Sequence, residues 1–175
     1  MEIWDIYDNN REKTGRTHIR GEKMVSGDYI VIVMILIFDS AGRMLLQQRP
    51  LNMTWGPGKW TMTAGGATKA GETSSQAAGR ELFEELGIKI DLTGVRPNFA
   101  MTNDTAFIDY YIVREDIDTT SLSVPNEEVA DVMWATKDKM LDMVDSGECM
   151  SYRKAFVEFC FDVATRPMLD STLSK

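Results

Sequence analysis

Residues 66–88 read GATKAGETSSQAAGRELFEELGI, and they fit the pattern G-x5-E-x7-R-E-(aliphatic)-x-E-E-x-G-(aliphatic) without a gap. If each fixed position of this pattern is matched by accident about once in fifteen, all of them coincide roughly once in 10^8 attempts. The match therefore indicates a specific chemical site rather than an accident of composition.

The second half of this stretch carries the signals of a capped helix. Thr73 and Gln76 make a capping box, and Gly87 suits the position just past a helix end. These signals predict a helix over residues 74–86. At 100° per residue, an arc of about 100° on this helix holds three carboxylates: Glu81, Glu84 and Glu85.

Three like charges on one helix face repel each other, by about 0.2–0.5 kcal/mol for each close pair. A divalent cation would reverse this cost, and carboxylate oxygens suit Mg²⁺ or Mn²⁺. Zinc is disfavoured because the chain has one His and no closely spaced pair of Cys. The alternative is that the acidic arc is only a solvated helix face. Gly65, Gly66 and Gly71 favour a ligand site, because glycines permit tight turns and close approach.

The complete pattern resembles the Nudix box, the signature of hydrolases that cut diphosphate bonds linked to another moiety. The resemblance implies the α/β class, as a Nudix-type α/β/α sandwich with a mixed sheet. It also implies metal-dependent attack of water on a phosphorus atom of a small nucleoside-diphosphate-type substrate. In such a reaction, bound Mg²⁺ or Mn²⁺ neutralises charge on the phosphoryl oxygens and lowers the pKa of the attacking water.

The resemblance also implies roles for individual residues. The expected metal ligands are the carbonyl oxygen of Gly65 and the carboxylates of the helix, Glu81, Glu84 and Glu85. Glu72 and Arg80 are expected to pair and to pin the loop against the helix. The expected structural brace of the box consists of Gly66, Glu72, Arg80 and Gly87.

The general base is open between a carboxylate of the helix and one from a distant loop. Glu127 and Glu128 lie in such a loop, before the predicted strand that contains Trp134. The interval from Glu128 to Trp134 matches the spacing of the distal metal-binding Glu in some family members. It therefore favours Glu128 over Glu127 as the distant catalytic carboxylate and as a further metal ligand. The alternative is that both are solvated loop acids.

The flanks of the box are similar to the Nudix branch related to isopentenyl-diphosphate isomerase, over about residues 3–160. Isomerases of this branch carry a catalytic Cys followed by a His, and the corresponding segment here, Ala64–Ala67, contains neither. Hydrolysis is therefore favoured over isomerisation. Arg49 and Lys59 flank this segment and are candidate phosphate-binding side chains, with ordinary solvated charges as the alternative.

Two other functions stay open beside nucleoside-diphosphate hydrolysis. One is an isoprenoid-diphosphate hydrolase or isomerase-like enzyme, because the missing Cys does not prevent binding of such a substrate. The other is a non-catalytic sensor that binds a nucleotide through the same fold. A sensor predicts a damaged box or a fused DNA-binding segment, and the sequence shows neither.

Composition limits the class of protein. The chain has 175 residues, is 43% hydrophobic and 26% charged, and carries a net charge of −8. The negative charge argues against nucleic-acid polymers as partners. The longest apolar run, Tyr29–Phe38, is too short to span a bilayer, and the N-terminus lacks the pattern of a signal peptide. Cys149 and Cys160 suit reduced thiols in a cytoplasmic protein. The family resemblance adds a homodimer as one option.

We expect a single domain over residues 1–165, which includes an N-terminal hairpin within 1–25, followed by a tail over 166–175. The expected strands are 4–7, 15–20, 30–38, 44–48, 60–64, 88–97, 106–113 and 129–135. Helices are expected over 74–86, 137–144 and 152–164.

Overall fold

The helix within the 66–88 stretch forms as its capping signals predict. Helix α1 covers Ser74–Leu86. The Thr73 side chain accepts a hydrogen bond from the Gln76 N–H, and the Gln76 side chain accepts one from the Thr73 N–H. Gly87 has a left-handed φ of 74° and ends the helix, with its N–H donating to carbonyl oxygens of the last turn. Residues that carry a side chain rarely adopt this φ, which explains why a glycine stands here.

The computed structural model describes residues 2–165, and it divides into two compact units. The first unit contains the residues up to Leu36 together with Ala64–Tyr111. The second contains Ile37–Thr63 and the described residues from Ile112 onward. The box, residues 66–88, therefore lies wholly in the first unit. The predicted tail, 166–175, lies outside the described residues.

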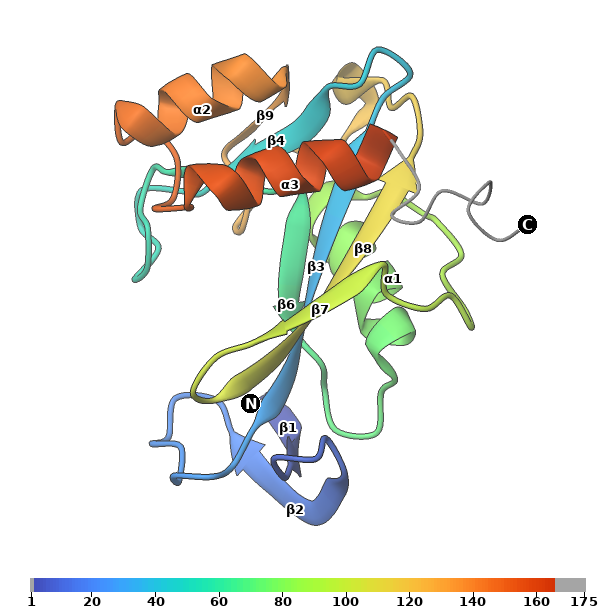
Figure 1. The fold of residues 1–175 in the computed structure, drawn as a ribbon, viewed down its shortest axis with the longest axis vertical. Helices are drawn as coiled ribbons and strands as arrows, with labels where there is room; N and C mark the ends of the chain where they lie inside the picture. The colour runs from blue at the N-terminus through green and yellow to red at the C-terminus, as the bar shows by residue number, and fades with distance from the viewer. Residues whose placement is uncertain (1, 166–175) are drawn as a thin grey trace, which may run out of the picture. The chain divides into compact units, whose positions relative to one another are not determined.

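The first unit is built on strands β1 Ile3–Tyr7, β2 Lys13–Ile19, β3 Ile30–Phe38, β6 Ala64–Ala67, β7 Phe99–Thr102 and β8 Ala106–Arg114, of which β3 and β8 continue into the second unit. Strands β1 and β2 form an antiparallel hairpin, drawn in blue in Figure 1. Strand β3 pairs antiparallel with β6, which places Val33 opposite Gly66. Strand β7 pairs antiparallel with β8, and α1 packs against β6.

Strands β3 and β8 run in the same direction. Ile30 N donates to Thr105 O at 3.0 Å at the beginning of the pair, and Glu115 N donates to Phe38 O at 3.0 Å at its end. The pairs of β3 with β6 and of β7 with β8 are antiparallel. The sheet is therefore mixed, which confirms the predicted α/β class.

The second unit is centred on β4, and its elements are β4 Met44–Gln48, β5 Trp60–Thr61, β9 Asp131–Ala135, α2 Lys137–Asp145 and α3 Lys154–Thr165. Strands β5 and β9 both pair antiparallel with β4. Helices α2 and α3, orange and red in Figure 1, pack against each other. A short 3-10 turn covers Thr119–Ser121.

The core of the first unit gathers on β3, as its apolar run predicts. Val33 and Ile35 are fully buried, and so are Leu82 and Leu86 on the apolar face of α1. Each such side chain contributes about 1.5–3 kcal/mol relative to exposure. This burial fixes which face of α1 points inward. No helix within residues 2–165 is long and apolar enough to cross a membrane.

The strand predicted over residues 88–97 is wrong. The Asp91 carboxylate accepts a hydrogen bond from the Thr93 N–H at 2.9 Å, and Gly94 takes a left-handed φ of 72°. Both features turn the chain, and Pro97 has no N–H for a sheet. The segment is therefore irregular, and the next strand begins at Phe99.

The strand predicted over residues 60–64 is divided into β5 and β6. Thr63 lies between them, and its hydroxyl accepts the Ile37 N–H at 2.9 Å and donates to Leu45 O at 2.6 Å. The Thr63 side chain, and not a backbone group, thus forms the hydrogen bonds to Ile37 and Leu45 between β5 and β6. The remaining predicted strands and helices form, with ends shifted by at most two residues.

Both cysteines are free and buried in the second unit. Burial raises the pKa of Cys149 to about 11 and that of Cys160 to about 12.

The raised pKa values predict slow thiol chemistry, because the thiolate is the reactive form. At about pH 8, we expect the native protein to react with a disulfide reagent at least roughly 100-fold more slowly than the urea-unfolded chain. Spectroscopic thiol titration measures this. Fast labelling of two thiols in the native protein would contradict it.

Candidate active site

The Arg80 guanidinium ties the box loop to helix α1. It donates to both carboxylate oxygens of Glu72, from Nε at 2.8 Å and from Nη2 at 3.0 Å. Nη2 also donates to the carbonyl oxygen of Ala67 at 3.1 Å. A bidentate pair between Arg and a carboxylate combines charge with a fixed geometry. The loop between Ala67 and Glu72 is therefore held at both ends by one side chain.

The same guanidinium contacts two of the three helix carboxylates. Arg80 Nη1 donates to Glu81 Oε1 at 2.7 Å and to Glu84 Oε2 at 2.9 Å. Lys69 Nζ reaches the other oxygen of Glu84 at 3.3 Å. These two cations offset the repulsion among the like charges on α1.

The three carboxylates differ in exposure. Glu81 and Glu85 are buried, at 7% and 6% exposed, whereas the Glu84 side chain is 43% exposed. A carboxylate is buried at a cost unless other groups compensate its charge. Two buried carboxylates one helical turn apart therefore concentrate negative charge on the inner side of α1, which a solvated helix face does not do.

The glycines before the helix are required by close approach. A Cβ at Gly66 would lie 2.3 Å from Glu81 Oε1, so this carboxylate packs directly on the loop backbone. A Cβ at Gly65 would lie 2.6 Å from the carbonyl oxygen of Val33 on the neighbouring strand. Gly66 therefore makes room for a carboxylate, and Gly65 makes room for the sheet.

The brace keeps both of its members charged. Burial is the largest single influence and disfavours the charge on both Arg80 and Glu72. Their mutual hydrogen bonds, together with Glu81 and Glu84 on Arg80 and with Lys69 on Glu72, outweigh it in sum. The pKa of Arg80 is consequently raised, and the pKa of Glu72 is lowered below its usual range. The ion pair therefore persists at neutral pH.

The chemistry of the donor set fits a hard divalent cation. Magnesium and manganese prefer oxygen ligands, and α1 carries three carboxylates, of which Glu81 lies against the backbone of Gly66. Arg80 and Lys69 at present engage both oxygens of Glu84 and one oxygen of Glu81. Within residues 2–165, no three Asp, Glu, His or Cys side chains converge as a metal cage. Metal binding by all three carboxylates would therefore need Glu84 either to release these cations or to share its oxygens between them and the metal.

The predicted site residues fall into two groups. Those in the first unit are Gly65, Gly66, Glu72, Arg80, Glu81, Glu84, Glu85 and Gly87. Those in the second unit are Arg49, Lys59 and Glu128. Within the first group, the contacts of Arg80 and of Gly66 join Glu72, Glu81 and Glu84. Glu85 and Gly87 lie on and at the end of the same helix, and Gly65 precedes Gly66 in β6.

Each residue of the second group has its own local surroundings. Glu128 is exposed, and its N–H donates to Asn126 Oδ1 at 2.8 Å. Arg49 Nε donates to Trp55 O at 2.8 Å, with its guanidinium 5.2 Å from the centroid of the Trp55 ring. Lys59 Nζ donates to the carbonyl oxygen of Gly147. The catalytic role of Glu128 and the phosphate-binding roles of Arg49 and Lys59 stay predictions.

Contacts among three polar residues, one within the box and two outside it, were not predicted. Asp109 in β8 is fully buried, and its Oδ2 accepts hydrogen bonds from the Arg11 guanidinium and from the hydroxyl of Ser74, the first residue of α1. A carboxylate in the middle of an apolar strand is a signal that could have identified Asp109, because buried charges are rare without a partner. Arg11, in the turn of the hairpin, carries no such signal.

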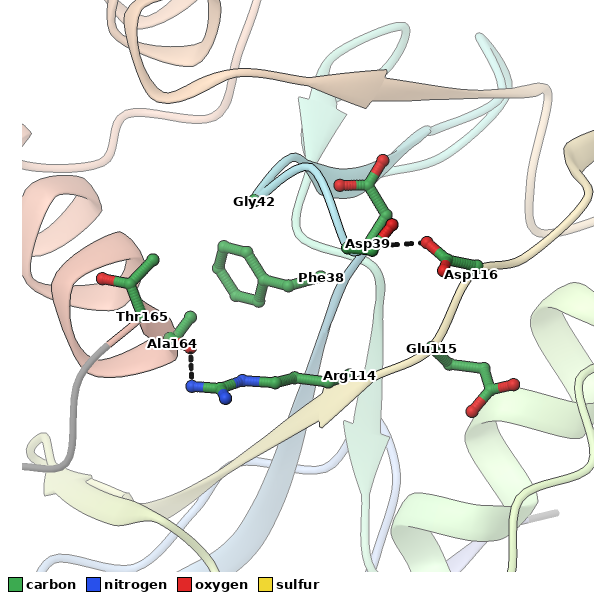
Figure 2. Close-up of a pocket in the computed structure, with 9 residues that line it drawn as sticks. Phe38, Asp39, Gly42, Arg114, Glu115, Asp116, Ala164 and Thr165 are labelled. Carbon is green, nitrogen blue, oxygen red and sulfur yellow. Dashed lines mark hydrogen bonds between the residues drawn. The ribbon is translucent and has the colours of Figure 1, made fainter.

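A cavity of about 500 Å³ opens in the second unit (Figure 2). Its polar side chains serve local structure: Arg114 donates to the carbonyl oxygen of Ala164 at the end of α3, and Asp116 accepts the Ser40 N–H at 2.8 Å. All residues that line the cavity belong to the second unit, so it contains none of the box carboxylates. We assign no substrate to it.

Comparison with protein families matches the NUDIX domain to residues 28–152. The Nudix hydrolase lmo0368 of Listeria monocytogenes is 41% identical over 152 residues, which cover 87% of this chain and 90% of that protein. An isopentenyl-diphosphate Delta-isomerase of Nocardia farcinica is 37% identical over 105 residues, which cover 57% of this chain and 59% of that protein.

A solved structure supports the fold. The crystal structure of DR0079 from Deinococcus radiodurans superimposes with a TM-score of 0.75 and covers 91% of this chain and 99% of that chain. Its sequence is 22% identical, so the likeness concerns the fold alone.

The two glycines before α1 give a matched pair of variants. We expect Gly65→Ala to destabilise the protein by about 1–3 kcal/mol, because the methyl group meets a backbone carbonyl that moves little. Gly66→Ala should cost less, because the methyl group meets only the end of the Glu81 side chain. Urea unfolding measures both. Equal destabilisation by the two variants would contradict the assigned contacts.

The Arg80 brace gives a second stability prediction. Arg80→Ala should lower the free energy of unfolding by about 1–3 kcal/mol, because it leaves the half-buried Glu72 carboxylate and the buried Glu81 without their cation. The control is Lys69→Ala, which removes an exposed pair with Glu84 and should cost less than about 1 kcal/mol. Denaturant unfolding at low salt compares the two. A larger loss for Lys69→Ala would show that Arg80 is not the brace.

Proposed function

Because the chain belongs to the Nudix family, we propose that it is a hydrolase that cleaves a diphosphate linkage in a small nucleoside-diphosphate-type compound by attack of water on phosphorus. One observation carries the proposal. The carboxylate of Glu81 packs on the backbone of Gly66, and α1 presents Glu84 and Glu85 beside it. Buried carboxylates next to a glycine backbone suit a metal ion that also contacts phosphate.

The proposed metal ligands are the carbonyl oxygen of Gly65 and the carboxylates of Glu81, Glu84 and Glu85. Bound Mg²⁺ or Mn²⁺ would neutralise charge on the phosphoryl oxygens and lower the pKa of the attacking water. Glu72 and Arg80 do not need to touch the substrate in this proposal. They hold the loop that carries Gly66 against the helix that carries the carboxylates.

The proton of the attacking water needs an acceptor, and two candidates are proposed for this general base: a carboxylate of α1 or Glu128. Exposure of Glu128 leaves it available for this role. Arg49 and Lys59 are the proposed phosphate ligands. Each now donates to a backbone carbonyl oxygen, so substrate phosphate would have to replace these partners or share the cation with them.

An isoprenoid diphosphate is the second candidate substrate, because a relative of this chain is an isopentenyl-diphosphate Delta-isomerase. The segment Ala64–Ala67 forms β6 and contains neither Cys nor His. This segment therefore has no Cys or His side chain that could transfer a proton. For an isoprenoid diphosphate we propose hydrolysis in preference to isomerisation.

We also propose that residues 1–165 form one domain, because the family match over 28–152 includes residues of both units. The two free, buried thiols favour a reducing compartment such as the cytosol.

Glu84→Gln tests the metal assignment. We expect kcat to fall more than about 100-fold, since a metal ligand contributes several kcal/mol to the transition state. The exposure of Glu84 should leave the melting temperature nearly unchanged. Glu158→Gln, which alters an exposed acid on α3, serves as the control. Full activity of the Glu84→Gln variant would remove Glu84 from the metal site.

The substrate is tested by a phosphate-release screen with Mg²⁺ and Mn²⁺. The panel contains nucleoside di- and triphosphates, ADP-ribose, dinucleotides, CoA and prenyl diphosphates. Turnover of a nucleoside diphosphate derivative supports the proposal, and turnover confined to prenyl diphosphates selects the second candidate. Nucleotide binding without any turnover would overturn the enzymatic proposal in favour of a sensor.

A further inference from the structure

The N-terminal hairpin, β1 and β2 in Figure 1, is hydrogen-bonded to the box loop. Through Arg11 in its turn and the Asp109 carboxylate of β8, it is also linked to Ser74, the first residue of α1. We propose that this hairpin is a clasp for the metal site, and that Asp5 and Arg11 are its positioning residues. The proposal rests on the metal site of the proposed function. Residues 3–19 lie outside the segment that the family model matches, 28–152, so the family match does not assign the hairpin a role.

The first contact of the clasp is made by β1. Ala70 N donates to Ile3 O at 2.8 Å, and Gly71 N donates to Asp5 Oδ2 at 2.9 Å. Asp5 Oδ2 also accepts Lys13 Nζ from β2 at 2.6 Å. The Lys13 bond, followed by the Gly71 bond, holds the pKa of Asp5 below its usual range. Asp5 therefore stays ionised at neutral pH and joins both strands of the hairpin to the box loop.

The second contact is made by Arg11 in the hairpin turn. Its guanidinium donates to Asp109 Oδ2, and the same oxygen accepts the Ser74 hydroxyl at 2.5 Å. The Tyr111 hydroxyl in turn donates to Ser74 Oγ at 2.9 Å. Asp109 is fully buried, so its charge depends on these partners. The hairpin is thereby joined to the residue where α1 begins.

The backbone of Arg11 shows that the turn is organised for this contact. Arg11 has a φ of 64°, a left-handed value that non-glycine residues seldom adopt. The turn is stabilised by Asp8, whose Oδ1 accepts the N–H groups of Asn10 and Glu12, both at 2.9 Å. An unfavourable conformation persists when its surroundings determine it, and Arg11 in this turn contacts Asp109.

The two contacts lie on either side of Glu72. Ala70 and Gly71 precede it, and Ser74 follows it. Glu72 itself is fixed by Arg80, which also bonds Glu81. The clasp therefore sets the position of the loop relative to the helix carboxylates. A supporting contact of this kind typically changes metal affinity or activity by about 10- to 100-fold when it is removed.

The test is calorimetric Mn²⁺ binding to the purified full chain, without substrate. We expect Asp5→Ala and Arg11→Lys each to weaken Mn²⁺ binding about 10- to 100-fold. The matched control is Arg20→Ala, because Arg20 pairs with Glu2 within the same hairpin at 2.7 Å. This control should bind Mn²⁺ like the wild type. Hydrogen–deuterium exchange at the amides of Ala70 and Gly71 should be faster in Asp5→Ala than in the wild type, and unchanged in the other two variants.

The outcomes separate the two proposals. Wild-type Mn²⁺ affinity in both clasp variants overturns the clasp and leaves the proposed function standing. A lower melting temperature with unchanged Mn²⁺ affinity assigns the hairpin a structural role only and also overturns it. Absence of Mn²⁺ binding by the wild-type chain overturns the proposed metal site and the clasp together. If Arg11→Lys fails to fold, the Asp5→Ala variant alone decides.

Discussion

The geometry of the box depends on the Arg80 guanidinium. A planar cation with five donors is shared among the loop carbonyl of Ala67, the carboxylate of Glu72 and the helix carboxylates of Glu81 and Glu84. A lysine ammonium at the same position lacks the planar fork that binds Glu72 at two points. One residue thus converts a flexible glycine-containing loop and an acidic helix into a single arrangement.

This arrangement lets the acidic helix fold before any metal arrives. In many metal sites the unpaired charges of the ligands make folding depend on the ion. Here Arg80 and Lys69 already compensate part of the negative charge of α1. The apolar face of the helix is buried independently through Leu82 and Leu86. The contacts that hold the helix are therefore independent of a metal ion, and Glu84, the exposed one of the proposed ligands, is the carboxylate whose contacts with Arg80 and Lys69 a metal would alter.

The parts of the fold that sequence could predict are those with local causes. Helix α1 followed from Thr73, Gln76 and Gly87, which act within a few residues, and β3 followed from an uninterrupted apolar run. The predicted strand over 88–97 failed because the side chain of Asp91 bonds the backbone two residues later, which favours a turn over a strand.

The site shows the same division. The three helix carboxylates could be grouped because their spacing is a helix spacing, whereas the pairing of Glu72 with Arg80 followed from the family resemblance. All of them lie in one unit. The Arg11–Asp109 pair could not be placed, since it joins residues 98 positions apart and depends on the fold of a hairpin. Nor did sequence reveal that Arg49 and Lys59 donate to backbone carbonyl oxygens. Such partners are set by tertiary packing, and a pattern of residue types does not encode them.

The buried Asp109 carboxylate also determines how the hairpin responds to warming. Asp109 is fully buried, so its carboxylate has left bulk water on folding. The cost of removing water from an ion falls as temperature rises, whereas the stabilisation from apolar contacts levels off. The Arg11–Asp109 ion pair therefore becomes more favourable, relative to the apolar contacts of the hairpin, as the temperature rises. As the temperature rises, an increasing share of the attachment of the hairpin comes from charge, and a decreasing share comes from apolar contact.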